Sequence, residues 1–366
     1  MDKTVYFLGA GFSKPAGGPV QNQIIETILS PDFKDKYTDN NHIKKALEKF
    51  TAFLRNDLHI KKKDYVNVEL EDIFTPIDRC LADSKSFGRY GNKALAALRE
   101  DLHLLMAAAI QFRVDQPGNN SDYIEQFALH IDKIAQSRML DNNDKIAIIT
   151  SNWDILLDNN LQKAINNNGI KKLAVVDYCC YISSLEDDPE IKPGLLALGK
   201  GGYNIKVLKL HGSTNWLHCP MCQRMYIIFN QKPMLGNPFY CNHCKKNYKI
   251  KKERASIQLR GNLLVPTFLK DLGNIQIKLV WQNAGIELNE ASKIVFIGYS
   301  LPAADFEIRQ LLSRSIPKDT SIDVVVYPLD KNKKELKERY KNFFGGRHLT
   351  FIEKEVTDYI REVCLP

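Results

Sequence analysis

The sequence has no run of about eighteen apolar residues, and this absence excludes a helix that spans a membrane. Its first residues, MDKTVYF, lack the basic and then apolar pattern of a secretory signal, so we expect a cytoplasmic protein. No internal repeat or low-complexity tract is visible. At 366 residues, the chain is long enough for one large globular domain with insertions, or for two domains.

Four of the eight cysteines lack the regular spacing of a disulfide framework, which fits reduced thiols in the cytoplasm. They are Cys80, Cys179, Cys180 and Cys364. The other four form two C-x-x-C pairs that are separated by residues 223–240, a spacing that predicts a structural zinc ribbon. Four thiolates would close a tetrahedral site and leave no position for water. The alternatives are two disulfides, four buried thiols, or a site in which His218 or His243 replaces one thiolate. The predicted ligands are Cys219, Cys222, Cys241 and Cys244.

Four short hydrophobic segments each end in a cluster of glycine or polar residues. Strands are expected at 3–8, 145–150, 205–210 and 293–297. The clusters that follow them are GAGFS (9–13), SNWD (151–154), HGS (211–213) and GYSLP (298–302). In an open parallel sheet, ligands bind beyond the carboxyl ends of the strands, so we expect these clusters to meet at one cleft.

The first cluster is typical of the start of a nucleotide-binding domain. Gly9 and Gly11 leave room for a pyrophosphate beside the backbone, and a helix expected at 20–29 would direct its N-terminal N–H groups at the anion. The third glycine of the usual dinucleotide fingerprint is replaced by Lys14, and no acidic residue closes a second strand about twenty residues later. The meaning of this variant turn therefore depends on the other clusters.

The segments GAGFS, TSNWD, KLHGS and IGYSLP together resemble the motifs of the sirtuin family in identity and order. A four-cysteine module directly after the histidine motif adds to the resemblance. The sequence is more similar still to the divergent sirtuin-like domains of bacterial anti-phage systems, many of which have T-x-N-x-D, K-L-H-G-S-x-N-W and G-Y-S-L-P-x-x-D segments. This resemblance covers most of the chain outside a helical insertion.

We predict an α/β fold, with a Rossmann-like doubly wound parallel sheet, an all-helical insertion and a small four-cysteine zinc-ribbon module. The sheet domain is expected at residues 1–30, 143–214 and 255–366, the insertion at 31–142 and the ribbon at 215–254. Within the insertion, composition and apolar spacing predict helices at 43–54, 70–81, 92–112 and 123–139. After the ribbon we expect a strand at 323–327, a helix at 333–344, an edge strand at 349–353 and a helix at 356–363.

The resemblance implies a role for each residue of the strand-end clusters. One group would act on the bond between nicotinamide and ribose, with the histidine as general base: Asn152, Asp154 and His211. A second group would contact NAD: Gly9, Ala10, Gly11, Ser13, Gly298, Ser300 and Val326. Without the resemblance, Asn152 is equally well explained as the N-cap of a helix over 153–161, and His211 as a hydrogen-bonded structural histidine.

Three differences separate the sequence from the sirtuins that remove acyl groups from lysine. All three concern the groove that binds the acyl-lysine substrate. The Phe- and Arg-bearing loop after the glycine turn is absent, Ser151 replaces a glutamine, and 263–270 (LLVPTFLK) replaces a strand that pairs with the substrate peptide. We therefore expect an NAD+ glycohydrolase that acts in anti-phage defence by depleting NAD. The alternatives are an NAD-dependent protein deacylase or ADP-ribosyltransferase, and a non-catalytic subunit that senses NAD or ADP-ribose.

The expected ligands are NAD+ as substrate and a structural Zn2+. The resemblance implies that activity is held off by homo-oligomerisation or by a separate sensor, such as a HerA-type ATPase or an Argonaute-like protein, since we expect no fused sensor domain. The net charge of +8 comes partly from basic runs at 61–63, 245–246 and 249–254. We interpret these runs as solvated surface, with nucleic acid as an alternative partner.

Overall fold

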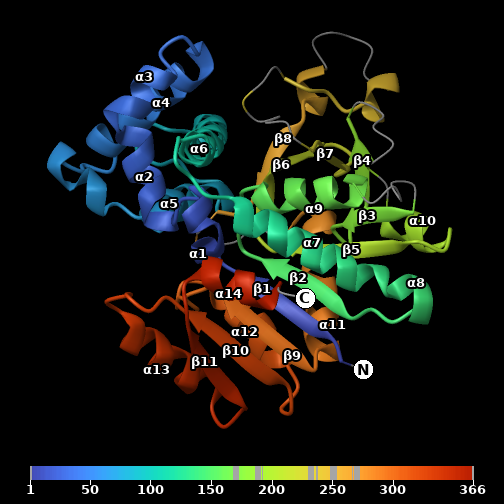
Figure 1. The fold of residues 1–366 in the computed structure, drawn as a ribbon. Helices are drawn as coiled ribbons and strands as arrows, with labels where there is room; N and C mark the ends of the chain where they lie inside the picture. The colour runs from blue at the N-terminus through green and yellow to red at the C-terminus, as the bar shows by residue number, and fades with distance from the viewer. Residues whose placement is uncertain are drawn as a thin grey trace.

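A computed structural model gives the fold of the protein (Figure 1). It describes residues 2–167, 173–185, 191, 193–229, 235, 238–247, 254–265, 267 and 273–364. Within these residues, no helix combines the length and the apolar character that a membrane crossing requires.

A seven-stranded sheet, parallel throughout, forms the centre of the molecule. Its order is β11-β10-β9-β1-β2-β5-β3. The strands are β1 (Thr4–Leu8), β2 (Ile146–Thr150), β3 (Ala174–Asp177), β5 (Tyr203–Lys209), β9 (Lys293–Ile297), β10 (Ser321–Val326) and β11 (Leu349–Glu353). The predicted parallel sheet is confirmed, and β11 lies at its edge as expected.

Helices cover both faces of this sheet, so it is doubly wound. Successive residues of a strand point to opposite faces, and Tyr6 and Phe7 of β1 show this. The Tyr6 ring lies 5.1 Å from that of Phe127 in α7, whereas Phe7 packs on Phe296, which contacts Tyr340 of α13. One face carries α7 (Asp122–Gln136), α9 (Leu156–Asn167) and α14 (Val356–Val363). The other carries α11 (Ile275–Glu290), α12 (Phe306–Ser315) and α13 (Lys333–Phe344).

A second hydrophobic core holds a helical module beside the sheet domain. Its helices are α2 (Gln21–Leu29), α3 (Pro31–Lys36), α4 (Asn41–Asn56), α5 (Leu70–Ala82) and α6 (Asn92–Val114), with the 3-10 turn η2 (Lys62–Asn67). Helices α2, α4, α5 and α6 agree with the predicted ones to within two residues, whereas α3 and η2 were not predicted. The helix expected at 123–139 divides into α7 and α8 (Arg138–Asp141). The predicted domain boundaries stay a prediction. Helix α2 packs within the helical module, and α7 packs on the sheet.

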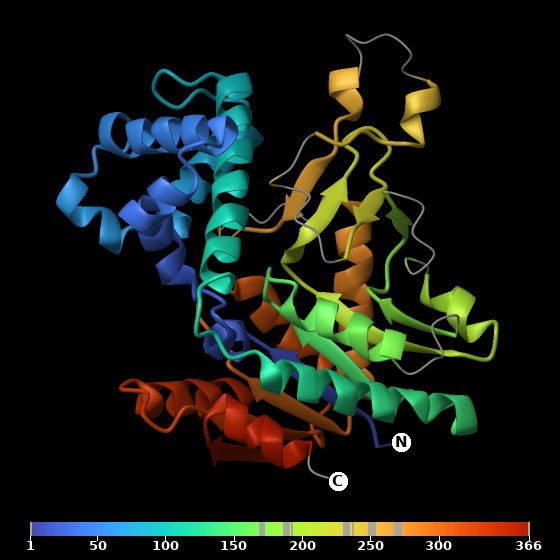
Figure 2. The ribbon, with the colours of Figure 1, turned by 45° about the horizontal axis from the view of Figure 1, so that its top comes forward.

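A four-stranded sheet in the order β4-β7-β6-β8 carries the cysteine pairs. Its strands are β4 (Ile182–Ser184), β6 (Gly212–His218), β7 (Met225–Ile227) and β8 (Arg260–Leu263). The remaining short elements are α1 (Ala10–Ser13), η1 (Lys14–Ala16), α10 (Gly194–Leu198), η4 (Cys244–Lys246) and η5 (Arg254–Ile257). Figure 2 shows this sheet and the helical module side by side, and α6 contacts β8 between them.

The basic runs are exposed where the structure describes them, as a solvated surface requires. Lys61, Lys62 and Lys63 are exposed on the helical module, and Lys245 and Lys246 are exposed beside the cysteines. Of the run at 249–254, only Arg254 lies within the described residues. The segment 263–270 was predicted to differ from the peptide-pairing strand of deacylases. Of this segment, Pro266 and residues 268–270 lie outside the described residues.

Candidate active site

The candidate site begins where two glycine turns meet at the carboxyl edge of the sheet. The chain leaves β1 for β2 on one side and later returns to β9 on the other, so β1 and β9 flank a topological switch point, where open α/β sheets bind ligands. The N–H of Gly9 donates to the carbonyl of Ile297 at 3.0 Å, and that of Gly11 donates to Gly298 at 2.9 Å. The cluster at 9–13 is thus pinned against the turn after β9.

Close backbone packing explains why these positions are glycine. A Cβ on Gly9 would lie 2.5 Å from the carbonyl oxygen of Gly298, and one on Gly298 would lie 2.1 Å from the nitrogen of Phe12. Gly298 also has a φ of +65°, in the left-handed region that favours glycine. Packing between two turns is therefore sufficient reason for the glycines, and their contact with a pyrophosphate stays a prediction.

Asn152 ties the end of β2 to the first glycine cluster. Its side-chain N–H2 donates to the carbonyl of Gly9 at 2.9 Å and to Oγ of Ser13 at 3.1 Å. Helix α9 begins at Leu156, whose N–H donates to Oδ1 of Asp154 at 3.1 Å. The alternative interpretation of Asn152 as a helix N-cap is therefore wrong, because Asp154 binds the N–H at the start of this helix.

The side-chain oxygen of Asn152 is a buried acceptor. The residue is only 9% exposed, and Oδ1 has no hydrogen-bond partner among the residues that the structure describes. Leaving such an atom without a donor costs about 1–3 kcal/mol, so native proteins rarely bury one without a reason. Because both donors of the amide are held by Gly9 and Ser13, the orientation of this oxygen is fixed. It is suited to accept a hydrogen bond from a ligand hydroxyl or a water.

Asp154 is a half-buried carboxyl group whose charge is disfavoured. Burial raises its pKa, while the charge of Lys209 and a hydrogen bond with Ser13 act in the opposite direction. Lys209 is itself buried: its ammonium donates to the carbonyl of Asp154 at 2.6 Å and pairs with Asp158 at 2.9 Å. Lys209 therefore fixes the backbone of the SNWD loop, a role that its position in the apolar run at 205–210 did not reveal.

His211 follows β5, the next strand of the sheet, and is buried. Its ring centroid lies 6.1 Å from that of Trp153, the neighbour of Asn152 in the chain. Its Nε2 lies 3.9 Å from Oδ1 of Asp305, which stands at the N-terminus of α12. The other carboxylate oxygen of Asp305 accepts a hydrogen bond from the Tyr299 hydroxyl at 2.9 Å.

The helical module reaches the same region through α5. Glu71 is buried there and accepts two hydrogen bonds of 2.7 Å from the side-chain amide of Gln21. Burial raises the pKa of Glu71, and the charge of Asp305 contributes in the same direction. Lys209 and Asp305 lie within the KLHGS and G-Y-S-L-P-x-x-D segments, but the sequence assigned them no role, and nothing in the local pattern of Glu71 separates it from an ordinary polar residue.

The remaining predicted contacts are spread along the same edge of the sheet. Ala10 opens α1, and Ser300 is exposed, with its carbonyl accepting from Arg339 at 2.7 Å. Val326 is fully buried at the end of β10, and its carbonyl accepts from the N–H of Lys354 at 3.1 Å. The structure thus brings Ser13, Asn152 and Asp154 into direct contact and leaves Ser300 and Val326 at neighbouring strand ends.

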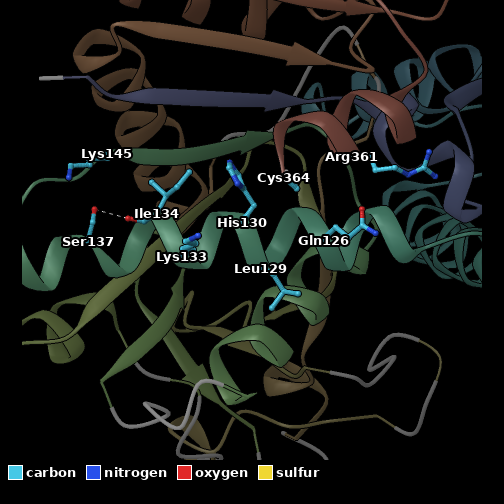
Figure 3. A pocket seen from close by; sticks show the side chains of 9 residues that line it. All are labelled: Gln126, Leu129, His130, Lys133, Ile134, Ser137, Lys145, Arg361 and Cys364. Carbon is cyan, nitrogen blue, oxygen red and sulfur yellow. Dashed lines mark hydrogen bonds between the residues drawn. The ribbon is translucent and has the colours of Figure 1, made fainter. Parts of the chain in front are cut away.

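A separate groove of about 780 Å³ lies on a face of the sheet domain, away from these strand ends. It runs along α7 beside α14, and its lining includes Leu129, His130, Lys133 and Cys364 (Figure 3). None of its lining residues belongs to the strand-end clusters. We therefore place the candidate site by the chemistry of the clusters and not by this groove.

The four cysteines form one cluster at the end of the four-stranded sheet. Their sulfur atoms lie within 4.8 Å of one another, with Cys222 and Cys241 3.6 Å apart and Cys219 and Cys244 4.0 Å apart. A tetrahedral zinc with bonds of about 2.3 Å requires sulfur separations of about 3.8 Å, so the cluster fits this ion. Cys219, Cys241 and Cys244 are buried, which suits a structural metal.

The fold and the sites define an α/β protein with a doubly wound parallel sheet and a separate four-cysteine cluster that could hold a metal ion. No known family model and no curated protein matches the sequence.

Solved structures that resemble the chain include several Sir2 proteins. A Sir2 homologue in complex with NAD is 14% identical, with a TM-score of 0.43, and the match covers 99% of this chain and 88% of that one. A Sir2 homologue mutant in complex with ADP-ribose is 14% identical, with a TM-score of 0.42 and coverages of 99% and 90%. A structure of a Sir2 enzyme described for mechanism and regulation is 12% identical, with a TM-score of 0.40 and coverages of 99% and 90%. At these low scores, the fold assignment rests on strand order and register.

Proposed function

We propose that the protein is an NAD+ glycohydrolase, which converts NAD+ and water into ADP-ribose, nicotinamide and a proton. The observation that carries the proposal is the buried Oδ1 of Asn152, which is fixed beside the glycine turns and has no donor among the described residues. The sirtuin-like order of the four clusters supports the same chemistry. A purely structural role gives little reason to retain such an acceptor.

Each residue of the site has a chemical task in this proposal. Asn152 would accept a hydrogen bond from a ribose hydroxyl or from the attacking water and so fix its position. His211 would take the proton that is released, since a histidine has a pKa near neutrality. Asp154 would accept from the carboxamide of the nicotinamide. The charge that develops on the ribose would then be quenched by water, with no acyl-lysine needed.

We further infer that a Zn2+ ion holds the four-cysteine cluster together and takes no part in the reaction. The sulfur separations support this ion, and metal analysis of the purified chain tests it. A defence role, with control by self-assembly or by a HerA-type or Argonaute-like partner, is part of the proposal and rests on the sequence resemblance alone.

Nicotinamide release from NAD+ by the purified chain tests the proposal, alone and with a candidate partner added. We expect release without any acyl-peptide and a loss of about 100- to 1000-fold or more in Asn152→Ala and in His211→Ala. Asn160→Ala is the matched control, because among the described residues its amide donates only to the Leu156 carbonyl within α9.

Two outcomes would redirect the assignment. Release that depends on an acyl-peptide, with formation of an O-acyl-ADP-ribose, would identify a deacylase. Tight NAD+ binding with no release under any condition would favour a sensing subunit. Full activity in Asn152→Ala would show that the site is wrongly placed.

A further inference from the structure

Asp305 is held beside His211 by residues of the hydrophobic core. The hydroxyl of Tyr299 donates to Oδ2 of Asp305, which leaves Oδ1 directed toward the imidazole at 3.9 Å from Nε2. Tyr299 is buried, and its ring lies 4.7 Å from that of Phe7 in β1. A rigid connection therefore runs from the central strand of the sheet through Tyr299 to Asp305.

Asp305 places a carboxylate 3.9 Å from Nε2 of the buried imidazole of His211. Trp153, on another side of the ring, is neutral. Tyr299 stays neutral because burial keeps its pKa well above the ordinary value. Glu71 of α5 interacts electrostatically with Asp305, whose charge helps burial to raise the pKa of Glu71. A carboxylate at this distance favours the protonated imidazole, and it is only 15% exposed, so water screens it weakly.

We propose that Asp305 is the positioning residue of the proposed base, His211. It holds the ring and stabilises the imidazolium that forms when His211 takes a proton. The inference rests on the proposed function, in which His211 is the base. The separation of 3.9 Å is longer than a hydrogen bond, and such contacts commonly shorten when substrate binds.

The kinetic test is Asp305→Asn in the full chain, because the amide keeps the shape of the side chain and removes its charge. We expect kcat for nicotinamide release to fall about 10- to 100-fold, with KM for NAD+ changed less than about 3-fold. Asp319→Asn makes the same chemical change at an exposed position and should behave like the parent. Tyr299→Phe leaves the carboxylate but removes the hydroxyl that holds it, so a smaller fall in kcat is expected.

A second readout reports on His211 without any turnover. The ring nitrogens of 15N-labelled protein are followed by NMR against pH, and His211→Ala identifies the signals of this residue. Because a neighbouring carboxylate favours the charged ring, the midpoint of the His211 titration should move to lower pH in Asp305→Asn, by about 0.5 to 1 pH unit. Tyr299→Phe should move it in the same direction by less.

The two readouts separate this inference from the proposed function. If the parent releases nicotinamide, and Asp305→Asn retains both the parent kcat and the parent midpoint, the positioning role is refuted while the function stands. If the midpoint moves as expected but the parent cleaves no NAD+ either alone or with a candidate partner, the pairing holds and NAD+ hydrolysis is the wrong reaction. Should Asp305→Asn fail to fold, Tyr299→Phe gives the same decision, because an unchanged midpoint there also refutes the role.

Discussion

Buried polar groups have different partners at the two ends of the central sheet. At the amino end, Lys3 contacts Asp144 at 3.1 Å, Glu290 at 2.8 Å and Glu287, and Lys206 contacts both Asp144 and Glu287. Burial opposes the charge of Lys3, yet these carboxylates together raise its pKa. Each charge at this end therefore faces an opposite one.

At the carboxyl end, burial is not fully compensated. Asn152 presents a buried acceptor with no donor among the described residues, and burial raises the pKa of Asp154 and of Glu71. Uncompensated polar groups lower stability, so a protein retains them where a ligand or a reaction uses them. The difference between the ends supports the proposal that the carboxyl end binds a ligand, whereas the amino end stabilises the fold.

The largest effect should come from breaking the amino-end network. Glu287→Gln weakens the pairing of the buried Lys3 and the half-buried Lys206, and removing one member of a buried ion pair costs about 3–5 kcal/mol. We expect a loss of about 3 kcal/mol in the free energy of unfolding, measured by urea denaturation. Nicotinamide release by the folded fraction should be unchanged.

Glu290→Gln is the matched control for this variant, because the Glu290 side chain is 54% exposed and its pair should contribute less than about 1 kcal/mol. Equal losses in the two variants would mean that burial does not distinguish the pairs. The contrast between the ends would then lose its energetic basis.

A smaller but still large effect should come from the glycine turns at the carboxyl end. Gly298→Ala combines a φ of +65° with a Cβ that would lie 2.1 Å from the nitrogen of Phe12, so the turns must separate. We expect a loss of about 2–3 kcal/mol in stability. Gly201→Ala shares a positive φ, +73°, but its Cβ meets nothing within 4 Å, so it should cost only about 1 kcal/mol. Similar values for both variants would argue that backbone strain, and not turn packing, requires the glycine.

Most of the central sheet was predictable because local pattern determines it. Apolar runs that end in turn residues located β1, β2, β5 and β9, and α13, β11 and α14 have the predicted bounds. The four-stranded sheet escaped prediction, since β4 and β7 have only three residues each, too few for a period to show. Their pairing depends on contacts with distant strands.

The candidate site was predictable only in part for the same reason. The motifs predicted four site residues that the structure places along one edge of the sheet: Ser13, Asn152, Asp154 and His211. Asp305 and Glu71 acquire their meaning from the folded chain, which sets Asp305 beside His211 and buries Glu71 against Gln21. Such pairings between distant segments leave no periodic signal in one sequence.

The smallest effect should appear in the pH dependence of Asp154. Because burial raises its pKa above the ordinary value, the folded chain binds more protons than the unfolded chain between the two pKa values. Stability therefore falls as pH rises through this window, which begins near the unfolded value of about 3.9, and it stays lower above it. Asp154→Asn removes this loss, so its Tm at pH 7 should exceed that of the parent by on the order of 1–2 °C, although nicotinamide release falls.

Thermal scans of Asp154→Asn and its parent across this window measure the effect, with Asp319→Asn as the exposed control. The gap in Tm between variant and parent should widen as pH rises. A lower Tm for Asp154→Asn at pH 7 would mean that Lys209 and Ser13 more than offset the burial of the carboxylate. Asp154 would then resemble the compensated charges of the amino end, and only Asn152 would still mark the carboxyl end as a binding site.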